Sequence, residues 1–134
     1  MENDKFYKTV FYIGCIWNFA VSVMLFILVG SLPEMLKIQP PNHSLFIYFN
    51  LYTIFVFGMM QFMVARDMRN SRNMVFILMW AKFIMLAVFV YVLIIDTPAK
   101  ELTEFLAPGM VIDLIFGLLF WRFLIYGKKQ VTAS

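Results

Sequence analysis

Cysteine, histidine and charge are all scarce in this chain. Its 134 residues include one cysteine, one histidine and only 14% charged residues, whereas a soluble domain usually carries about a quarter. Cys15 therefore has no partner for a disulfide within the chain, and we expect it to be a buried structural thiol. His43 lies in a Pro-rich segment and is expected to be an exposed turn residue, because zinc needs three or four ligands. No CxxC, HExxH or Gly-rich phosphate loop occurs, so no metal site is predicted.

Apolar residues, by contrast, are in excess. They make up 63% of the chain, and 19% of all residues are aromatic. A protein of this size cannot bury that much apolar surface in its own core, so much of it must face lipid. A spanning helix needs about 20 apolar residues, and four stretches meet this length. The sequence predicts one all-α domain over residues 1–134, a polytopic membrane four-helix bundle with spans at about 7–29, 45–65, 74–95 and 105–126.

The basic residues lie at the ends of the apolar stretches and predict an orientation. Positive charge near a span marks the cytoplasmic side. We therefore expect the N-terminus, the second loop and the C-terminus to be cytoplasmic, with Lys5, Lys8, Arg66, Arg69, Arg72, Lys128 and Lys129 there. The first span is interpreted as a retained helix and not as a signal peptide, because its apolar run is too long and no cleavage pattern follows. The net charge of +3 is not gathered on one polar face, so no nucleic-acid partner is expected.

Two charged residues, Lys82 and Asp113, and the amide Asn18 lie at mid-depth in the apolar spans. A charge at mid-membrane is unfavourable by at least about 2.5 to 3.5 kcal/mol, so each needs a partner or a purpose. Counted from the cytoplasmic ends, Lys82 lies about 13 Å deep, Asn18 about 15 Å and Asp113 about 18 to 20 Å. Lys82 and Asp113 can therefore form an ion pair between neighbouring helices, with Asn18 in the same layer.

Small residues flank these polar positions at a spacing of four. Such residues allow close helix packing and direct a polar side chain into the bundle. The helix-packing residues predicted in this way are Gly14 and Ser22 around Asn18, Gly109 and Gly117 around Asp113, and Gly58 on the second helix. The polar layer itself has three interpretations. It is a structural clasp, a site that binds a ligand or relays a proton, or a lysine that only extends to the membrane surface.

Other residues that invite a functional interpretation are given plainer roles. Arg66, Asp67, Arg69 and Arg72 are expected in a solvated cytoplasmic loop that touches lipid phosphates, where Asp67 pairs with Arg66 or caps the next helix. Arg122, nine residues beyond Asp113, is expected on the opposite face, extending to head groups. The tyrosines and tryptophan near the span ends are expected to anchor at the interface: Tyr7, Tyr12, Tyr48, Trp121 and Tyr126. Met59, Met60, Met63 and Met68 suggest copper(I), but apolar filling is favoured.

Taken together, the pattern resembles small bacterial four-helix membrane proteins that are loosely grouped with the DoxX-like proteins. The resemblance covers nearly the whole chain. It is carried by Trp17-Asn18, Gly58, Ala65-Arg66-Asp67, Asn70, Arg72-Asn73, Lys82, Asp113, Phe116 and Phe120. It implies a bundle in a bacterial inner membrane, and it hints at redox or quinone-associated work, for which the chain has no haem, flavin or thiol motif.

Three classes of function follow. The first is a binding or accessory protein that holds a lipid, a quinone or a partner helix at the polar layer. The second is a small proton-coupled transporter that acts as a dimer through Lys82 and Asp113. The third, a membrane enzyme, comes last because no nucleophile, base and metal can be assembled. The expected partners are membrane lipids and a second copy or another membrane protein, and no cofactor is assigned.

Overall fold

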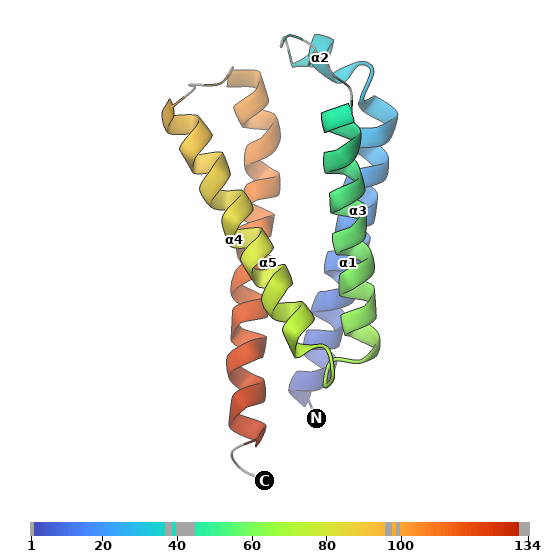
Figure 1. The fold of residues 1–134 in the computed structure, drawn as a ribbon, viewed down its shortest axis with the longest axis vertical. Helices are drawn as coiled ribbons and strands as arrows, with labels where there is room; N and C mark the ends of the chain where they lie inside the picture. Colours follow the sequence, from blue (N-terminus) through green and yellow to red (C-terminus); the bar gives the residue numbers. More distant parts are fainter. Residues whose placement is uncertain (1, 37–38, 40–44, 96–97, 99, 132–134) are drawn as a thin grey trace.

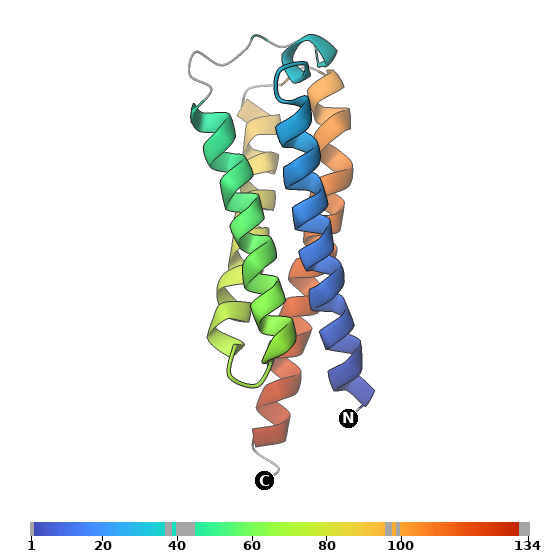
Figure 2. The same cartoon turned by 90° about the vertical axis from the view of Figure 1, so that its right-hand side faces the viewer.

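The protein folds as a bundle of long helices (Figures 1 and 2). The computed structural model describes residues 2–36, 39, 45–95, 98 and 100–131, and within them no strand occurs. The helices are α1 (Glu2–Leu28), α2 (Leu32–Met35), α3 (Leu45–Arg66), α4 (Arg72–Ile95) and α5 (Lys100–Val131). Four of them, all except α2, are long and apolar enough to cross a membrane. Helices satisfy their own backbone hydrogen bonds, which is why such apolar runs adopt them in lipid.

The helix bounds agree with most of the predicted spans and correct others. α3 and α4 match the second and third predicted spans within two residues. α1 starts at Glu2, five residues earlier than expected. α5 starts at Lys100 inside the predicted third loop and includes Pro108, and an exposed ion pair between Lys100 and Glu104 (3.6 Å) links its first turn. The proposed exposed turn at His43, together with Asp96 and Lys37, lies outside the described residues.

A short helix that the sequence did not predict follows the first span. α2 consists of Leu32–Met35, with Pro33 in its first turn, where a missing backbone N–H leaves no donor unsatisfied. The backbone N–H of Ser31 bonds to the Leu28 carbonyl at 2.9 Å and closes α1. The pattern of hydropathy could not reveal α2, because four residues are too few to show a helical period.

The four long helices form two pairs. α1 packs mainly against α3, and α4 mainly against α5, whereas contacts between the pairs are fewer. Both chain ends and the α3–α4 turn lie at one end of the bundle, and α2 lies at the other (Figure 1). We call these the terminal half and the α2 half.

The buried core lies in the terminal half. It is rich in aromatic rings, and the rings of Phe11 and Phe120 stack across the two helix pairs with centroids 5.1 Å apart. Its buried members are Tyr7, Val10, Phe11, Val64, Ala65, Val75, Leu78, Met79, Phe116, Phe120 and Phe123. The outward faces of the helices expose large apolar side chains such as Ile27 and Ile94, as expected of surfaces that contact lipid.

Two predictions about single residues have clear outcomes here. Cys15 is a free thiol that is buried, as expected. Tyr7 was expected at the interface, but its ring is only 4% exposed and packs edge-on against Phe123 with centroids 5.2 Å apart. Its ring is therefore directed into the bundle and not outward, although the residue lies near the N-terminal end of α1.

Candidate functional site

An ion pair joins α4 and α5 near the middle of the bundle. Lys82 Nζ lies 2.5 Å from Asp113 Oδ1. The side chain of Lys82 is 6% exposed and that of Asp113 is 15% exposed. The two residues thus meet as their estimated depths suggested. A buried pair of this kind is weak support for stability by itself, because removing two charges from water offsets much of their attraction.

A chain of hydrogen bonds extends from this pair to the other two helices. Lys82 Nζ lies 3.5 Å from Asn18 Oδ1 on α1, and Asn18 Nδ2 donates to Gln61 Oε1 on α3 at 3.0 Å. An ammonium can only donate, so the side-chain oxygen of Asn18 must face Lys82. The amino group of Asn18 is then directed at Gln61. The lysine therefore sets the direction of the whole chain, which links all four long helices.

Gln61 is the member of this layer that sequence reasoning missed. Its side chain is fully buried, and its Nε2 has no hydrogen-bond partner among the residues that the structure describes. A signal was present in Gly58, three residues earlier on the same helix, because small residues mark where a neighbouring helix comes close. An amide near such a glycine is directed into the bundle.

Most of the predicted small residues do lie at close helix contacts. A Cβ on Gly14 would lie 2.8 Å from Gln61 Oε1, and one on Gly58 would lie 2.8 Å from the Phe19 ring. Ser22 donates from its hydroxyl to the Leu51 carbonyl at 2.9 Å and ties α1 to α3.

The two glycines of α5 behave differently from each other. A Cβ on Gly117 would lie 3.0 Å from the Phe83 ring, so Gly117 permits close packing with α4. Around Gly109, no atom of a neighbouring helix in the described part of the chain lies within 4 Å of such a Cβ, so its assignment as a packing residue was wrong. This part of α5 borders a cavity, so a spacing of four from Asp113 does not by itself bring a glycine against a neighbouring helix.

This cavity occupies the α2 half, and all four long helices line it. Its volume is about 260 Å³, just below the roughly 300 Å³ at which small-molecule sites begin. Asn18, Lys82 and Asp113 border it at the end nearest the terminal half, and Asn50 and Thr53 are its other polar residues. Its apolar residues are Trp17, Val21, Met24, Leu25, Ile54, Phe57, Ala81, Met85, Phe105, Leu106, Pro108, Gly109 and Met110.

One of the three arginines around the α3–α4 turn, Arg72, is less solvated than predicted. Arg72 is the first residue of α4, and its Nη2 donates to the Leu124 carbonyl of α5 at 2.7 Å in a partly buried contact. Arg72 therefore links two helices, which corrects its assignment to a solvated loop. The guanidinium of Arg66 stays at the surface, 6.0 Å from the ring centroid of Phe62, and Arg69 is exposed.

Asp67 organises the turn itself. Its carboxylate accepts a hydrogen bond from Asn70 Nδ2 at 2.8 Å and from the Asn70 backbone N–H at 3.3 Å. These bonds, the side-chain one first, favour the ionised form and hold the pKa of Asp67 below its ordinary value of 3.8. Ser71 starts the next helix, since its carbonyl accepts the first helical bond, from Val75, at 3.0 Å.

The two methionines that share a helix face, Met59 and Met63, point outward. Met59 and Met63 are 49% and 54% exposed and lie on the outer surface, which suits apolar contact with lipid. Within the described ranges no group of three or more His, Cys, Asp or Glu side chains gathers.

The comparisons with known proteins assign no family. No family model, no curated protein and no solved structure matches this chain, so the DoxX-like resemblance stays a prediction.

Proposed function

We propose that the protein binds an amphipathic molecule, a quinone or a lipid, in the cavity of the α2 half. The observation that carries this proposal is the composition of the cavity: mostly apolar walls from four helices, with an ion pair and an amide at one end. Ligand sites share this design, because apolar walls provide affinity while a few polar groups fix orientation. A structural clasp alone would not need the open space beside it.

The polar groups match the head of such a molecule. Lys82 and Asn18 Nδ2 already have partners, but Asp113 keeps 15% of its side chain exposed where it borders the cavity. A carbonyl or hydroxyl head group placed here would meet a donor in Lys82 and an acceptor in Asp113. Its apolar part would lie along rings such as Phe57 and Phe105. A charged head would add an uncompensated charge, so a neutral head is favoured.

The proposed setting is a bacterial inner membrane with both chain ends in the cytoplasm. Support for this orientation comes from charge. The terminal half ends in a set of basic residues from both chain ends and from the α3–α4 turn: Lys5, Lys8, Arg66, Arg69, Arg72, Lys128 and Lys129. The opposite end carries Glu34, Glu101 and Glu104 beside Lys100. An excess of Lys and Arg near span ends favours the cytoplasmic side.

Tryptophan fluorescence offers a direct test of binding. Trp17 borders the cavity, whereas Trp80 and Trp121 are about half exposed on the outside. In a Trp80→Phe/Trp121→Phe background, decylubiquinone and a bromine-labelled diacylglycerol, both of which quench a nearby indole, are titrated separately in detergent. We expect saturable quenching of Trp17 by one of them.

A filled cavity provides the control for this test. Gly109→Leu adds a side chain at the cavity wall, where a Cβ has nothing within 4 Å among the described residues, and should remove saturable quenching. Gly30→Leu is the matched control, since a Cβ on Gly30 would also have nothing within 4 Å, but Gly30 lies outside the cavity. Equal quenching in Gly109→Leu and Gly30→Leu would overturn the proposal.

The transporter hypothesis has less support. It requires the Lys82–Asp113 pair to form and break during a cycle. Both partners belong to the α4–α5 pair of helices, which contact each other extensively, so a movement between the two helix pairs would leave the ion pair intact. Of the two described polar contacts of Lys82, the longer one, to Asn18 (3.5 Å), crosses between the pairs.

A further inference from the structure

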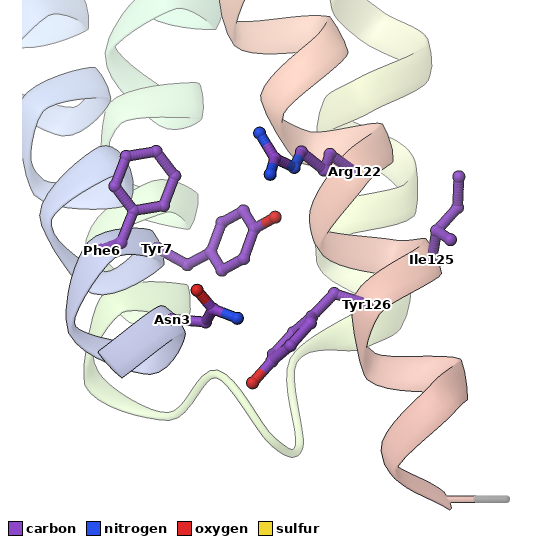
Figure 3. Close-up of a pocket in the computed structure, with 6 residues that line it drawn as sticks. All are labelled: Asn3, Phe6, Tyr7, Arg122, Ile125 and Tyr126. Atoms are coloured by element: carbon purple, nitrogen blue, oxygen red, sulfur yellow. The ribbon is translucent and has the colours of Figure 1, made fainter. Parts of the chain in front are cut away.

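A second pocket lies between α1 and α5 in the terminal half, on the far side of the aromatic core from the cavity (Figure 3). Its volume is about 210 Å³. Its lining residues are Asn3, Phe6, Tyr7, Arg122, Ile125 and Tyr126. None of them takes part in the polar layer at the middle of the bundle.

Hydrogen-bond donors converge in this pocket. Figure 3 shows the guanidinium of Arg122 reaching from α5 toward α1, with the Tyr7 hydroxyl close by and the Asn3 amide between Tyr7 and Tyr126. Asn3 and Tyr7 are four positions apart on α1, and Arg122 and Tyr126 are four positions apart on α5, so each pair shares a helix face. Guanidinium, phenol and amide groups are the donors that bind phosphate in proteins.

The pocket is also electrostatically suited to an anion. No carboxylate among the described side chains lies within ion-pair distance of Arg122. The Tyr7 ring is held in place by an edge contact with Phe123 and a tilted contact with Tyr126, at 5.2 and 5.8 Å between centroids. The Tyr7 hydroxyl is therefore held in place before any ligand arrives, which reduces the entropy that this donor loses on binding.

The depth of the pocket points to a lipid as the source of that anion. The apolar stretch predicted for α1 begins at Tyr7 and that for α5 ends at Tyr126, and both residues line the pocket. The pocket therefore lies where hydrocarbon gives way to head groups. Phe6 and Ile125 add apolar surface that an acyl chain can follow, as a free phosphate ion would not.

From this geometry we propose that Arg122, Tyr7 and Asn3 form a binding site for the phosphate of an anionic lipid. Arg122 contributes the charge and Tyr7 and Asn3 contribute neutral donors. Arg122 was expected only to extend to the membrane surface, but it turns toward α1 and shares a pocket with these two residues.

Native mass spectrometry in a neutral detergent tests the proposal. Phosphatidylglycerol is added to the full chain and to Arg122→Gln, Arg122→Lys, Tyr7→Phe and Arg69→Gln. We expect Arg122→Gln to weaken phosphatidylglycerol binding on the order of tenfold, as for the loss of one charged hydrogen-bond partner. Tyr7→Phe keeps the ring packing and removes only the hydroxyl, so a loss of about threefold or more is expected from it even where Arg122→Gln does not fold.

Arg69→Gln is the matched control, because Arg69 is an exposed arginine near the same end of the bundle but outside the pocket. It should change the affinity by less than about twofold. Arg122→Lys should bind more weakly than the natural chain, because lysine lacks the planar fork of donors. Three results would overturn the proposal: equal losses in Arg122→Gln and Arg69→Gln, equal binding of phosphate-free diacylglycerol, or displacement of phosphatidylglycerol by glycerol phosphate alone.

Discussion

The two halves of this bundle use the same four helices in opposite ways. In the terminal half, rings from α1 and α5 fill the space between the helix pairs, and Phe11, Phe120 and Val64 have no exposed surface. In the α2 half the same helices leave a cavity of about 260 Å³. Apolar surface gains little by moving from lipid to a protein core, so packing and hydrogen bonds hold membrane helices together. The ring packing of one half thus allows the other to stay hollow.

The ion pair lies at the boundary between these halves. On α5, Asp113 separates Pro108 and Gly109, which border the cavity, from the buried rings of Phe116 and Phe120. The polar layer is therefore supported from the packed side and accessible from the hollow one. Substitutions that distinguish the halves should show this division as differences in stability.

The most direct comparison of the halves is between two phenylalanines of α5. Phe120→Ala removes a fully buried ring stacked on Phe11 and should lower the free energy of unfolding by about 2 to 3 kcal/mol, from the cavity and the lost ring contacts. Phe105→Ala enlarges a cavity that already exists and should lower it by less than about 1 kcal/mol. SDS titration of the folded chain in mixed micelles measures both. Similar losses in the two variants would contradict the division into a packed and a hollow half.

The boundary itself should be sensitive to the loss of one charge. Lys82→Met leaves the Asp113 carboxylate without its cation and should lower the free energy of unfolding by about 3 kcal/mol. This is the smaller end of the range of about 3 to 5 kcal/mol for broken buried pairs, because Asp113 keeps some exposure. Lys82→Met/Asp113→Asn removes both charges and should return to within about 1 kcal/mol of the natural chain. The same SDS titration gives these values.

Ligand binding by that double variant separates a structural pair from a functional one. If the pair holds a ligand head group, the double variant should show no saturable quenching of Trp17 although its stability is restored. Recovery of both stability and quenching would mean that the pair serves only as a clasp.

Glycine substitutions should have opposite signs in the two settings. Gly14→Ala places a Cβ 2.8 Å from Gln61 Oε1, and Gln61 cannot move without losing its bond to Asn18. We expect a loss of about 1 to 2 kcal/mol, as for other over-packed sites. Gly109→Ala enters open space and should gain up to about 1 kcal/mol from its better helix propensity. Thermal unfolding in detergent measures both signs, and a gain in Gly14→Ala would show that Gln61 is free to move.

Much of the fold could be predicted, because each long helix is visible in the length of its apolar run. The ion pair could also be predicted, since a charge in lipid restricts where its partner can lie. The cavity could not. Gly109 and Gly117 have the same spacing from Asp113. Gly117 packs against Phe83 of α4, whereas Gly109 borders the cavity, and the sequence does not distinguish the two.

Residues near the helix ends were predicted least well. Arg72 looks like a loop cation in the sequence, and its bond to the Leu124 carbonyl depends on α5 passing beside the start of α4. Tyr7 looks like an outward-facing ring in the sequence, and its packing against Phe123 depends on α5 passing beside the start of α1. Such contacts between distant segments are set by packing, which hydropathy does not record.

The smallest expected effect concerns the turn that closes the packed half. The hydrogen bonds from Asn70 lower the pKa of Asp67 in the folded chain, so their stabilisation is present above the unfolded value, near 3.8, and is lost as the pH falls through the lower folded value. Asp67→Asn should therefore have a slightly lower Tm than the natural chain at about pH 6, and the difference should vanish near about pH 2. In an Asn70→Ala background, where the donor side chain is absent, the same substitution should change the Tm much less at either pH. A difference between the two chains that stays constant from about pH 6 to about pH 2 would show that Asp67 acts through turn geometry and not through its charge.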